Sequence, residues 1–279
     1  MAVLRAMPPR TGARGANLAL LLAMMLVTAI PLISLLTTAL QPQGTTPSGL
    51  SIPSTPTWFN FADAWEQTSF LTLLGSTAII VLGVVPLTVV LSTMAGYALA
   101  QLRLPGGAFL LALFVFGLTL PFEAILTPLY YMMQGLGLLN TQLSLILPLI
   151  GLHMPFAVFW MRSHFVNVPA EVTEAAQIDG ASALGAFRHI QIPLAMPAWV
   201  SLTMLLSLWT TNQFMLAIVL INDPLKRTLA GALGAFQGEK TTNVVLVCAV
   251  TLLIMAPTTI LFVFLQKHFT KALLQGIAK

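Results

Sequence analysis

Long uncharged apolar runs dominate this chain, and short polar segments separate them. Five runs without Asp, Glu, Lys or Arg each exceed the roughly 20 residues that a helix needs to cross a bilayer. These runs lie between Arg14 and Asp63, Glu66 and Arg103, Glu123 and Arg162, Arg188 and Asp223, and Lys240 and Lys267. With the apolar run around Glu123, they predict six transmembrane helices. Their expected ranges are about 17–40, 69–99, 107–132, 140–161, 197–221 and 242–266.

The segments between these spans are expected to be loops and tails. Residues 1–16 and 267–279 form terminal tails, and 69–266 is the core that holds the last five spans. Residues 41–68 are rich in Pro, Ser, Thr and Gly, which is typical of a loop. The aromatic residues of this loop suit either a membrane-interface belt or contact with a soluble partner. They are Trp58, Phe59, Trp65 and Phe70.

Composition gives the same class of protein. Hydrophobic residues make up 57% of the chain and charged residues only 7%, whereas soluble domains have about 25% charged residues. The chain is therefore predicted to be an all-α, polytopic membrane protein. Its first apolar run follows three arginines, as in a signal peptide, but continues to about Leu40 and is expected to be an uncleaved span. The single cysteine, Cys248, excludes an internal disulfide.

The basic residues predict the orientation. If the N-terminus is cytoplasmic, nine of the twelve Lys and Arg residues fall in cytoplasmic segments. The three on the outer side are Lys226, Arg227 and Lys240. Because cytoplasmic loops carry an excess of Lys and Arg, both termini are expected inside, and the loop at 165–195 is expected to be cytoplasmic. The same bias explains the net charge of +4 better than nucleic-acid binding does.

Charge is concentrated in one short stretch, "EVTEAAQIDGASALGAFRHIQIP" at 171–193. Pro169 can open a helix whose first turn carries Glu171, and Asp179-Gly180 then predicts a turn. A second amphipathic piece is expected to place Leu184, Phe187 and Ile190 on one face. Two short cytoplasmic helices with small residues at their surface predict a docking element for another protein. A helix lying in the lipid headgroups is disfavoured, because such helices are usually basic.

The spacing within this stretch resembles the EAA motif of permease subunits of ATP-binding-cassette (ABC) importers. It runs Glu174-Ala175-Ala176, three residues, Gly180, nine residues, Ile190, one residue, then Ile192-Pro193. The flanking "VPAEVTEAAQIDGAS" is similar to the carbohydrate, maltose-type branch. "LPFEAILTPLYYMMQGLGLLNT" and "FLQKHFTKALLQGIAK" stand at matching distances. The resemblance covers the chain from about Phe70 onward. One departure is "WTTNQF", where the branch commonly has Asn directly after Trp.

This resemblance implies a type I ABC importer transmembrane domain in a prokaryotic cell membrane. It implies a heterodimer with a second permease, two ATPase subunits that bind ATP and magnesium, and an extracytoplasmic sugar-binding protein that docks on outer loops including 41–68 and 222–241. The chain itself would be non-catalytic and bind no cofactor. Its loop would be the coupling helix that seats on the ATPase. The coupling residues expected from the motif are Glu174, Ala175, Ala176, Asp179, Gly180, Ala181, Phe187 and Pro193.

A second set of residues is expected along the substrate path. Glu123 is an acid within a span, where a charge costs roughly 2.5–3.5 kcal/mol on insertion scales, so it should face a cavity or a partner. A structural role at Pro121 is the alternative. The fifth span offers an aromatic surface with amides that would suit a sugar, although such residues are usually packing residues. They are Trp209, Asn212, Gln213 and Phe214.

Other chemistry is not supported by the sequence. "GAFQGEKTT" resembles a phosphate-binding loop, but Glu239 separates Gly238 from Lys240 and no strand precedes it. The four histidines have no metal-ligand spacing, and no Ser or Cys has a base nearby in sequence. His153, inside the fourth span, could line the path but is more readily a packing residue.

The sequence therefore predicts the permease subunit of a carbohydrate importer driven by separate ATPases. An ABC permease for polyamine, phosphate or peptide would share the core motif and stays an alternative. An ion-coupled secondary transporter would need paired ionisable groups within the membrane and usually inverted repeats, neither of which is evident here. A membrane scaffold would not need so many proline-interrupted spans.

Overall fold

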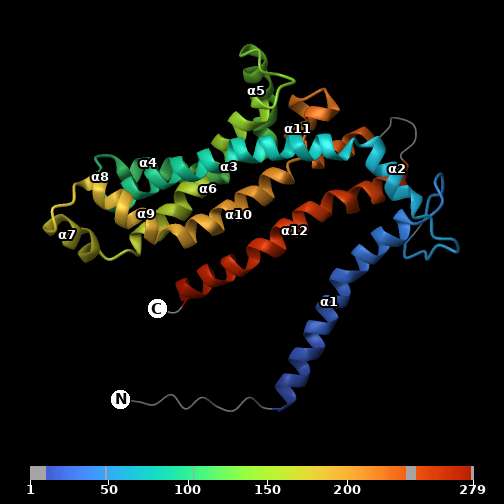
Figure 1. Ribbon diagram of the computed structural model, residues 1–279, viewed down its shortest axis with the longest axis horizontal. Coiled ribbons are helices and arrows are strands. Elements are labelled where there is room, and N and C mark those ends of the chain that lie inside the picture. The colour runs from blue at the N-terminus through green and yellow to red at the C-terminus, as the bar shows by residue number, and fades with distance from the viewer. Residues whose placement is uncertain (1–10, 48, 103, 237–242, 278–279) are drawn as a thin grey trace. The chain divides into compact units, whose positions relative to one another are not determined.

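The computed structural model describes residues 11–47, 49–102, 104–236 and 243–277. Residues 1–10 of the expected N-terminal tail, Arg103, Gly238, Glu239, Lys240 and Lys279 lie outside the described residues. Within the described ranges the regular elements are all helical (Figure 1). The longer helices are α1 (Thr11–Ala39), α3 (Phe70–Gln101), α4 (Gly107–Thr119), α5 (Phe122–Gly135), α6 (Leu143–Val166), α10 (Met196–Thr211) and α12 (Val244–Ile277).

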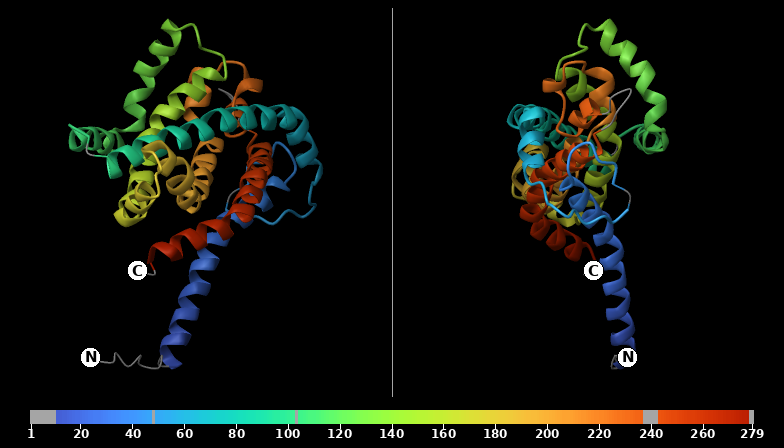
Figure 2. Two further views of the ribbon diagram at one scale, coloured as in Figure 1. Left: turned by 60° about the vertical axis from the view of Figure 1, so that its left-hand side comes forward. Right: turned by 90° about the vertical axis from the view of Figure 1, so that its right-hand side faces the viewer.

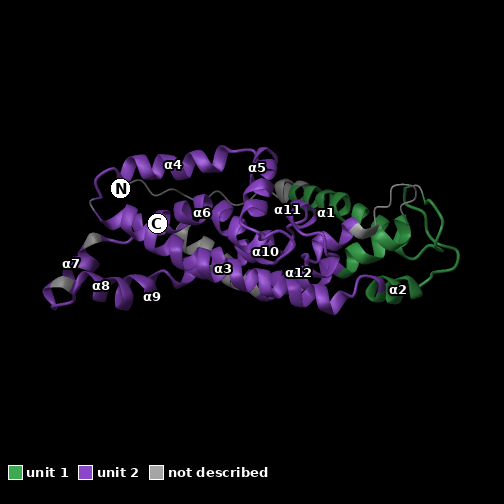
Figure 3. Cartoon of the chain, turned by 90° about the horizontal axis from the view of Figure 1, so that it is seen from above, with its two compact units in different colours: residues 1–66, 236–253 green, residues 67–235, 254–279 purple. Residues whose placement is uncertain are grey.

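Shorter helices connect these. They are α2 (Phe59–Gln67), α7 (Ala170–Ile178), α8 (Ala183–Ala186), the π-helix η1 (Phe187–Gln191), α9 (Ile192–Leu194), α11 (Met215–Leu220), and the 3-10 helices η2 (Pro224–Lys226) and η3 (Ala230–Phe236). The chain divides into two compact units (Figure 3). The first comprises 1–66 and 236–253, and the second comprises 67–235 and 254–279.

The second unit is built on close packing of α3 against α6, with α10 against both helices and α4 against α6 (Figures 1 and 2). Two glycines of α3 permit this approach. A Cβ at Gly83 would lie 2.8 Å from Cδ1 of Ile146, and one at Gly96 would lie 2.7 Å from the backbone nitrogen of Arg162. Small residues at such contacts are how membrane helices gain van der Waals packing without help from water.

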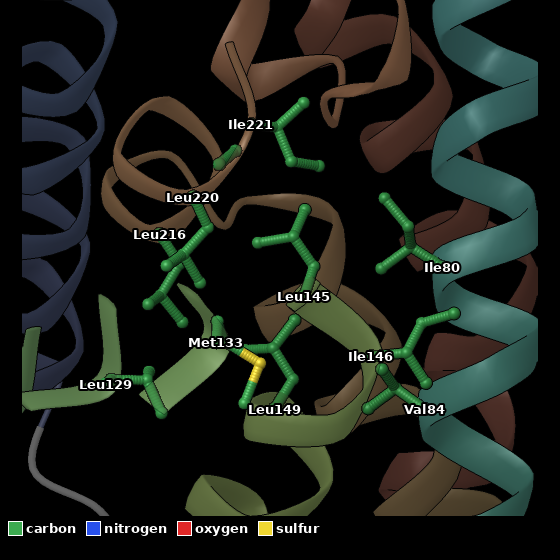
Figure 4. Close-up of a cluster of buried hydrophobic side chains, with 11 residues drawn as sticks. Ile80, Val84, Leu129, Met133, Leu145, Ile146, Leu149, Leu216, Leu220 and Ile221 are labelled. Carbon is green, nitrogen blue, oxygen red and sulfur yellow. The ribbon is translucent and has the colours of Figure 1, made fainter. Parts of the chain in front are cut away.

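The core of this unit is an apolar cluster that joins four helices (Figure 4). Ile80 and Val84 of α3 point toward Leu145, Ile146 and Leu149 of α6. Leu129 and Met133 of α5, Leu216, Ala217 and Leu220 of α11, and Ile221 directly after α11 complete the cluster. A second cluster, which includes Val89, Met161, Phe165 and Leu202, joins α3, α6 and α10. These two clusters fix the helices that flank the loop between α6 and α10.

Four helices within the described residues are long and apolar enough to cross a membrane, and two bent helix pairs raise this to six if each pair is one span. The predicted third span is one such pair, because α4 and α5 meet at 101° (Figure 2). Leu120, the residue before Pro121, is extended with ψ 126°, as expected where a proline follows. The α12 helix contains the predicted sixth span and continues to Ile277. The count of six spans stays a prediction.

The first unit contains a tightly tied connection between α1 and α2. The side chain of Asn60 is fully buried, and its Nδ2 donates to the backbone oxygens of Ala39 and Gln41, each at 2.8 Å. The Thr57 backbone N–H also donates to the Leu40 carbonyl at 2.8 Å. These bonds satisfy carbonyls that the end of α1 would otherwise leave unpaired.

Candidate functional site: the loop between α6 and α10

The first half of the loop is a short helix that ends in a glycine turn. The α7 helix begins directly after Pro169, and the exposed Glu171 lies in its first turn. At its end Gly180 has φ +84°, and the Ala181 N–H donates to the Ala176 carbonyl at 2.9 Å. This is the bond of a Schellman motif, in which the left-handed residue is usually glycine. The motif therefore favours glycine at this position.

Gly180 is constrained by its backbone rather than by crowding. Apart from the glycine itself and its two neighbours, no atom of the described residues lies within 4 Å of where its Cβ would be. Asp179 and Gly180 are both exposed, and Ala181 is half-buried. The turn therefore projects from the loop and leaves room for another molecule to approach the glycine closely.

The second half of the loop differs from the regular amphipathic helix that its 3.6-residue pattern predicts. Ser182 caps α8 by accepting the Gly185 N–H at 3.1 Å. The chain then forms the π-helix η1 and the short α9, which contains Pro193, and meets α10 at a bend of 67°. Because a π-turn closes its hydrogen bonds over five residues, the 3.6 periodicity is interrupted. Leu184 lies in α8, before the π-helix begins, and is 74% exposed, while Phe187 is half-buried.

An aromatic contact anchors the loop to α3, and a hydrogen bond ties the two halves of the loop together. The Phe187 ring lies 4.6 Å from the ring of Tyr97 on α3, which meets Phe165 on α6 edge to face at 5.4 Å. Gln191 is fully buried, and its Nε2 donates to Thr173 Oγ1 at 2.8 Å, which ties η1 to α7. Sequence reasoning missed Tyr97, Gln191 and Thr173, because none of them stands out in the linear pattern.

The outward surface of the loop combines carboxylates with apolar side chains. Ile178 is 86% exposed on one side of the turn and Leu184 is exposed on the other. The exposed residues of this surface include Glu171, Glu174, Ala175, Ile178, Asp179, Ser182 and Leu184. Ala176, by contrast, is buried. An acidic rim around two apolar side chains suits a protein surface that offers a hydrophobic pocket with basic residues beside it.

The expected substrate-path residues of the fifth span surround the end of α10. The exposed Trp209 ring lies 4.8 Å from Phe156 and 5.9 Å from His153, both on α6. The imidazole Nδ1 of His153 is buried and has no hydrogen-bond partner. An aromatic face beside an unsatisfied ring nitrogen can offer stacking and a polar contact to a ligand.

The neighbouring amides are partly committed to the fold. Asn212 is exposed, and its Nδ2 donates to the Leu208 carbonyl at 2.9 Å. The backbone carbonyl of Gln213 accepts from Thr228 Oγ1 at 2.6 Å, and Phe214 is half-buried beside it. These residues therefore join α10 to the loop that follows α11.

Glu123 lies apart from that group. It is exposed in the first turn of α5, directly after the break at Pro121, where the positive end of the helix dipole favours a carboxylate. The helix expected across 107–132 is therefore interrupted just before Glu123, and the expectation that its carboxylate faces a cavity or a partner stays a prediction. In the described part of the chain no hydrogen bond, ion pair or ring contact joins Glu123 to Trp209, Asn212, Gln213 or Phe214.

The loop that follows α11 is held by its own hydrogen bonds. Asn140 accepts the Asp223 N–H at 2.8 Å, and Arg227 Nε donates to the Ile221 carbonyl at 2.8 Å. Ser76 Oγ donates to the Lys226 carbonyl at 2.8 Å, so α3 supports the same loop. No group of three or more His, Cys, Asp or Glu suited to a metal ion occurs among the described residues.

Comparison with known proteins places this geometry in context. Residues 89–275 match the family model of binding-protein-dependent transport system inner membrane components. A probable ABC transporter permease of Bacillus subtilis is 35% identical over 82% of this chain and 76% of its own length. A melibiose, raffinose and stachyose import permease of the same organism is 32% identical, over 90% of this chain and 91% of its own length.

A diacetylchitobiose uptake permease of Streptomyces coelicolor is 29% identical, over 92% of this chain and 86% of its own length. Among solved structures, a bacterial ABC transporter involved in the import of the acidic polysaccharide alginate aligns with a TM-score of 0.76. The alignment covers 94% of this chain and 100% of that chain at 21% identity, which establishes a shared fold.

Proposed function

Because the chain belongs to the binding-protein-dependent transport system inner membrane components, we propose that it is the permease subunit of an ATP-driven importer for a carbohydrate. The members of this family lie in the inner membrane, and the apolar helices of this chain agree with a multi-pass protein there. Support for a carbohydrate comes from relatives named for melibiose, diacetylchitobiose and arabinooligosaccharides.

The observation that carries the coupling role is the projecting turn at Gly180. The loop offers a rigid tip, held by the bond from Ala181 to Ala176, with Ile178 and Leu184 exposed beside it. We propose that this tip seats on a separate ATPase subunit that supplies ATP and magnesium. Glu174 and Asp179 pair with basic residues of that subunit. Ala175 lies on the exposed side, where a small side chain permits close approach.

Movement passes from the tip to the spans through the anchored half of the loop. When ATP closes the ATPase dimer, the loop shifts, and Phe187 transmits this shift to Tyr97 on α3. Pro193 leads into the bend that joins α9 to α10. Such coupling requires the inward-open and outward-open states to differ in their affinity for ATP or for substrate.

The remaining parts of the assembly follow from the same proposal. A second, related permease completes the path, two ATPase subunits bind the two loops on the cytoplasmic side, and an extracytoplasmic binding protein delivers the sugar. Trp209 and His153 offer this sugar an aromatic face and a polar contact, with Asn212, Gln213 and Phe214 beside them. Glu123 offers a carboxylate at the break between α4 and α5.

The purified complex tests this proposal. The complex is reconstituted in liposomes with its binding protein, and ATP hydrolysis is measured with and without candidate oligosaccharides. We expect a loaded binding protein to stimulate hydrolysis and to drive uptake. Uptake by this chain without ATPase subunits, or hydrolysis that ignores every loaded binding protein, would contradict it.

A further inference from the structure

The short helix α2 of the first unit has an exposed face that is rich in aromatic side chains. On α2 and the residue before it, Trp58, Phe61, Ala62 and Trp65 follow spacings of three, four and seven, which places them on one face. Trp58 is 66% and Trp65 is 40% exposed, and Trp58 stacks on Phe61 with ring centroids 6.2 Å apart. We call these four residues the aromatic face. Tryptophan concentrates at membrane interfaces, where one part of the ring is apolar and its N–H stays wet.

The position of α2 along the membrane normal is fixed by α1. The apolar span Asn17–Ala39 has 23 residues. At 1.5 Å per residue it rises about 35 Å, slightly more than the ~30 Å of hydrocarbon in a bilayer. The end of α1 at Ala39 therefore lies at the boundary between hydrocarbon and headgroups.

Hydrogen bonds hold α2 at that boundary. Asn60 Nδ2 bonds the carbonyls of Ala39 and Gln41, and Gln43 Nε2 reaches both Asn60 Oδ1 at 3.2 Å and Asp63 Oδ2 at 2.7 Å. Because these contacts join the first half of α2 to the end of α1, the helix cannot rise far from the membrane surface.

The loop between the two helices also turns back toward the membrane. Ser34 Oγ donates to the Gly49 carbonyl at 3.3 Å, which brings the loop to a level more than one helical turn before the end of α1. The two apolar residues that follow, Leu50 and Ile52, are 54% and 85% exposed. Exposed apolar side chains at this depth meet lipid rather than bulk water.

We propose that α2 is an interfacial helix that inserts the aromatic face into the lipid headgroup region at the end of α1. The charged residues of the helix are Asp63 and Glu66, both acidic. Helices recruited to membranes from water are usually basic, but α2 is delivered by the span to which it is tied and needs no such attraction. Its insertion should therefore not depend on anionic lipid. The proposal does not rest on the transported solute.

Spin labels at two exposed positions test this. The full chain with Cys248→Ser receives a single cysteine by Ala62→Cys on the aromatic face or by Gln67→Cys on the opposite side of the helix, in phosphatidylcholine nanodiscs. Both positions are exposed. We expect the label at 62 to collide with oxygen and to be shielded from a water-soluble nickel complex. The label at 67 should show the opposite preference. Adding one fifth phosphatidylglycerol should change neither result.

Three outcomes would overturn the proposal. One is equal nickel access at 62 and 67, and another is shielding at 62 that appears only with anionic lipid. The third is shielding that requires the assembled transporter and is lost in the chain alone, which would assign the face to a partner protein.

A second measurement avoids new cysteines. Brominated phosphatidylcholines quench tryptophans that lie at the depth of the bromine atoms, so the wild-type chain is compared with a Trp58→Phe/Trp65→Phe variant. We expect the variant to lose a fraction of the quenching by lipids brominated near the headgroups and to keep the quenching by lipids brominated near the chain ends. Unchanged shallow quenching in the variant would refute the insertion of α2.

Discussion

Phe187 and Tyr97 lie with their ring centroids 4.6 Å apart, at an angle of 42°. The contact joins the π-helix of the loop to α3, and Tyr97 continues to Phe165 of α6. Since α3 and α6 form the centre of the second unit, this pair connects the docking loop directly to the spans. It motivates the first prediction.

Replacing Tyr97 by alanine should uncouple ATP hydrolysis from uptake. Each aromatic pair contributes about 0.5–1.5 kcal/mol beyond its buried area, and Tyr97→Ala removes two such pairs while leaving the outer surface of the loop intact. We expect normal binding of the ATPase subunit and fewer sugar molecules carried per ATP, measured in liposomes. Tyr97→Phe keeps both ring contacts and should behave as wild type. An equal loss in both variants would show that the rings do not transmit the movement.

Gly180→Val should weaken docking without preventing insertion. A residue with a Cβ in the left-handed conformation costs roughly 1–2 kcal/mol, and the valine side chain would also project where a partner approaches. We expect reduced copurification of the ATPase subunit and loss of uptake. Asn tolerates this conformation, so Gly180→Asn should retain more binding than the valine variant. Full uptake by Gly180→Val with normal copurification would argue against the docking turn.

Gly96→Ala should destabilise the packing of α3 on α6. The new methyl group would lie 2.7 Å from a backbone nitrogen, which cannot move aside as a flexible side chain could. Overpacking of this kind costs typically about 1–3 kcal/mol. Gly75 of the same helix provides a matched control, since its Cβ would meet nothing within 4 Å. Thermal unfolding in detergent should show a lower midpoint for Gly96→Ala than for Gly75→Ala.

Asn60→Leu should release α2 from the end of α1. The change removes both donors to the carbonyls of Ala39 and Gln41, and a buried group left unsatisfied costs about 1–3 kcal/mol. We expect faster cleavage after Asp63 or Glu66 by a protease specific for acidic residues. Asn167→Leu removes a bond to the Ser163 carbonyl that is local and exposed, and should not change this rate. Identical cleavage of all three proteins would mean that other contacts hold α2.

Trp209→Ala should reduce uptake while leaving ATPase binding unchanged, because Trp209 lies on α10, outside the docking loop. The alanine variant would lose the indole ring that lies beside Phe156 and His153. Trp209→Phe keeps an aromatic ring and should restore part of the uptake. Uptake is measured at several concentrations of the candidate sugar. We expect the alanine variant to have a lower apparent affinity for the sugar. Unaltered uptake in Trp209→Ala would remove this residue from the proposed path.

The helical class and the loop at 165–195 could be predicted from the sequence, because both follow from the uncharged runs and from the charged residues that lie between them. The sequence predicts prolines that interrupt the spans but does not distinguish Pro121, where the helix breaks, from the others. Pro31, Pro86, Pro148, Pro155 and Pro257 remain inside continuous helices, so proline alone does not identify a break. The contact between Tyr97 and the loop was not predicted either. An aromatic residue in a long apolar run looks the same in sequence whether or not it contacts a loop.

The π-helix at Phe187–Gln191 also affects the orientation of the docking loop. A π-turn holds one residue more than an α-turn, so the direction of every side chain after it is offset by about 100°. Deleting one residue from this segment would let it become ordinary α-helix and would rotate the Gly180 turn relative to α10. The orientation of the docking surface about the axis of the fifth span therefore depends on one extra residue in the π-turn. Related chains with a different number of residues in this segment should present the glycine turn in another direction.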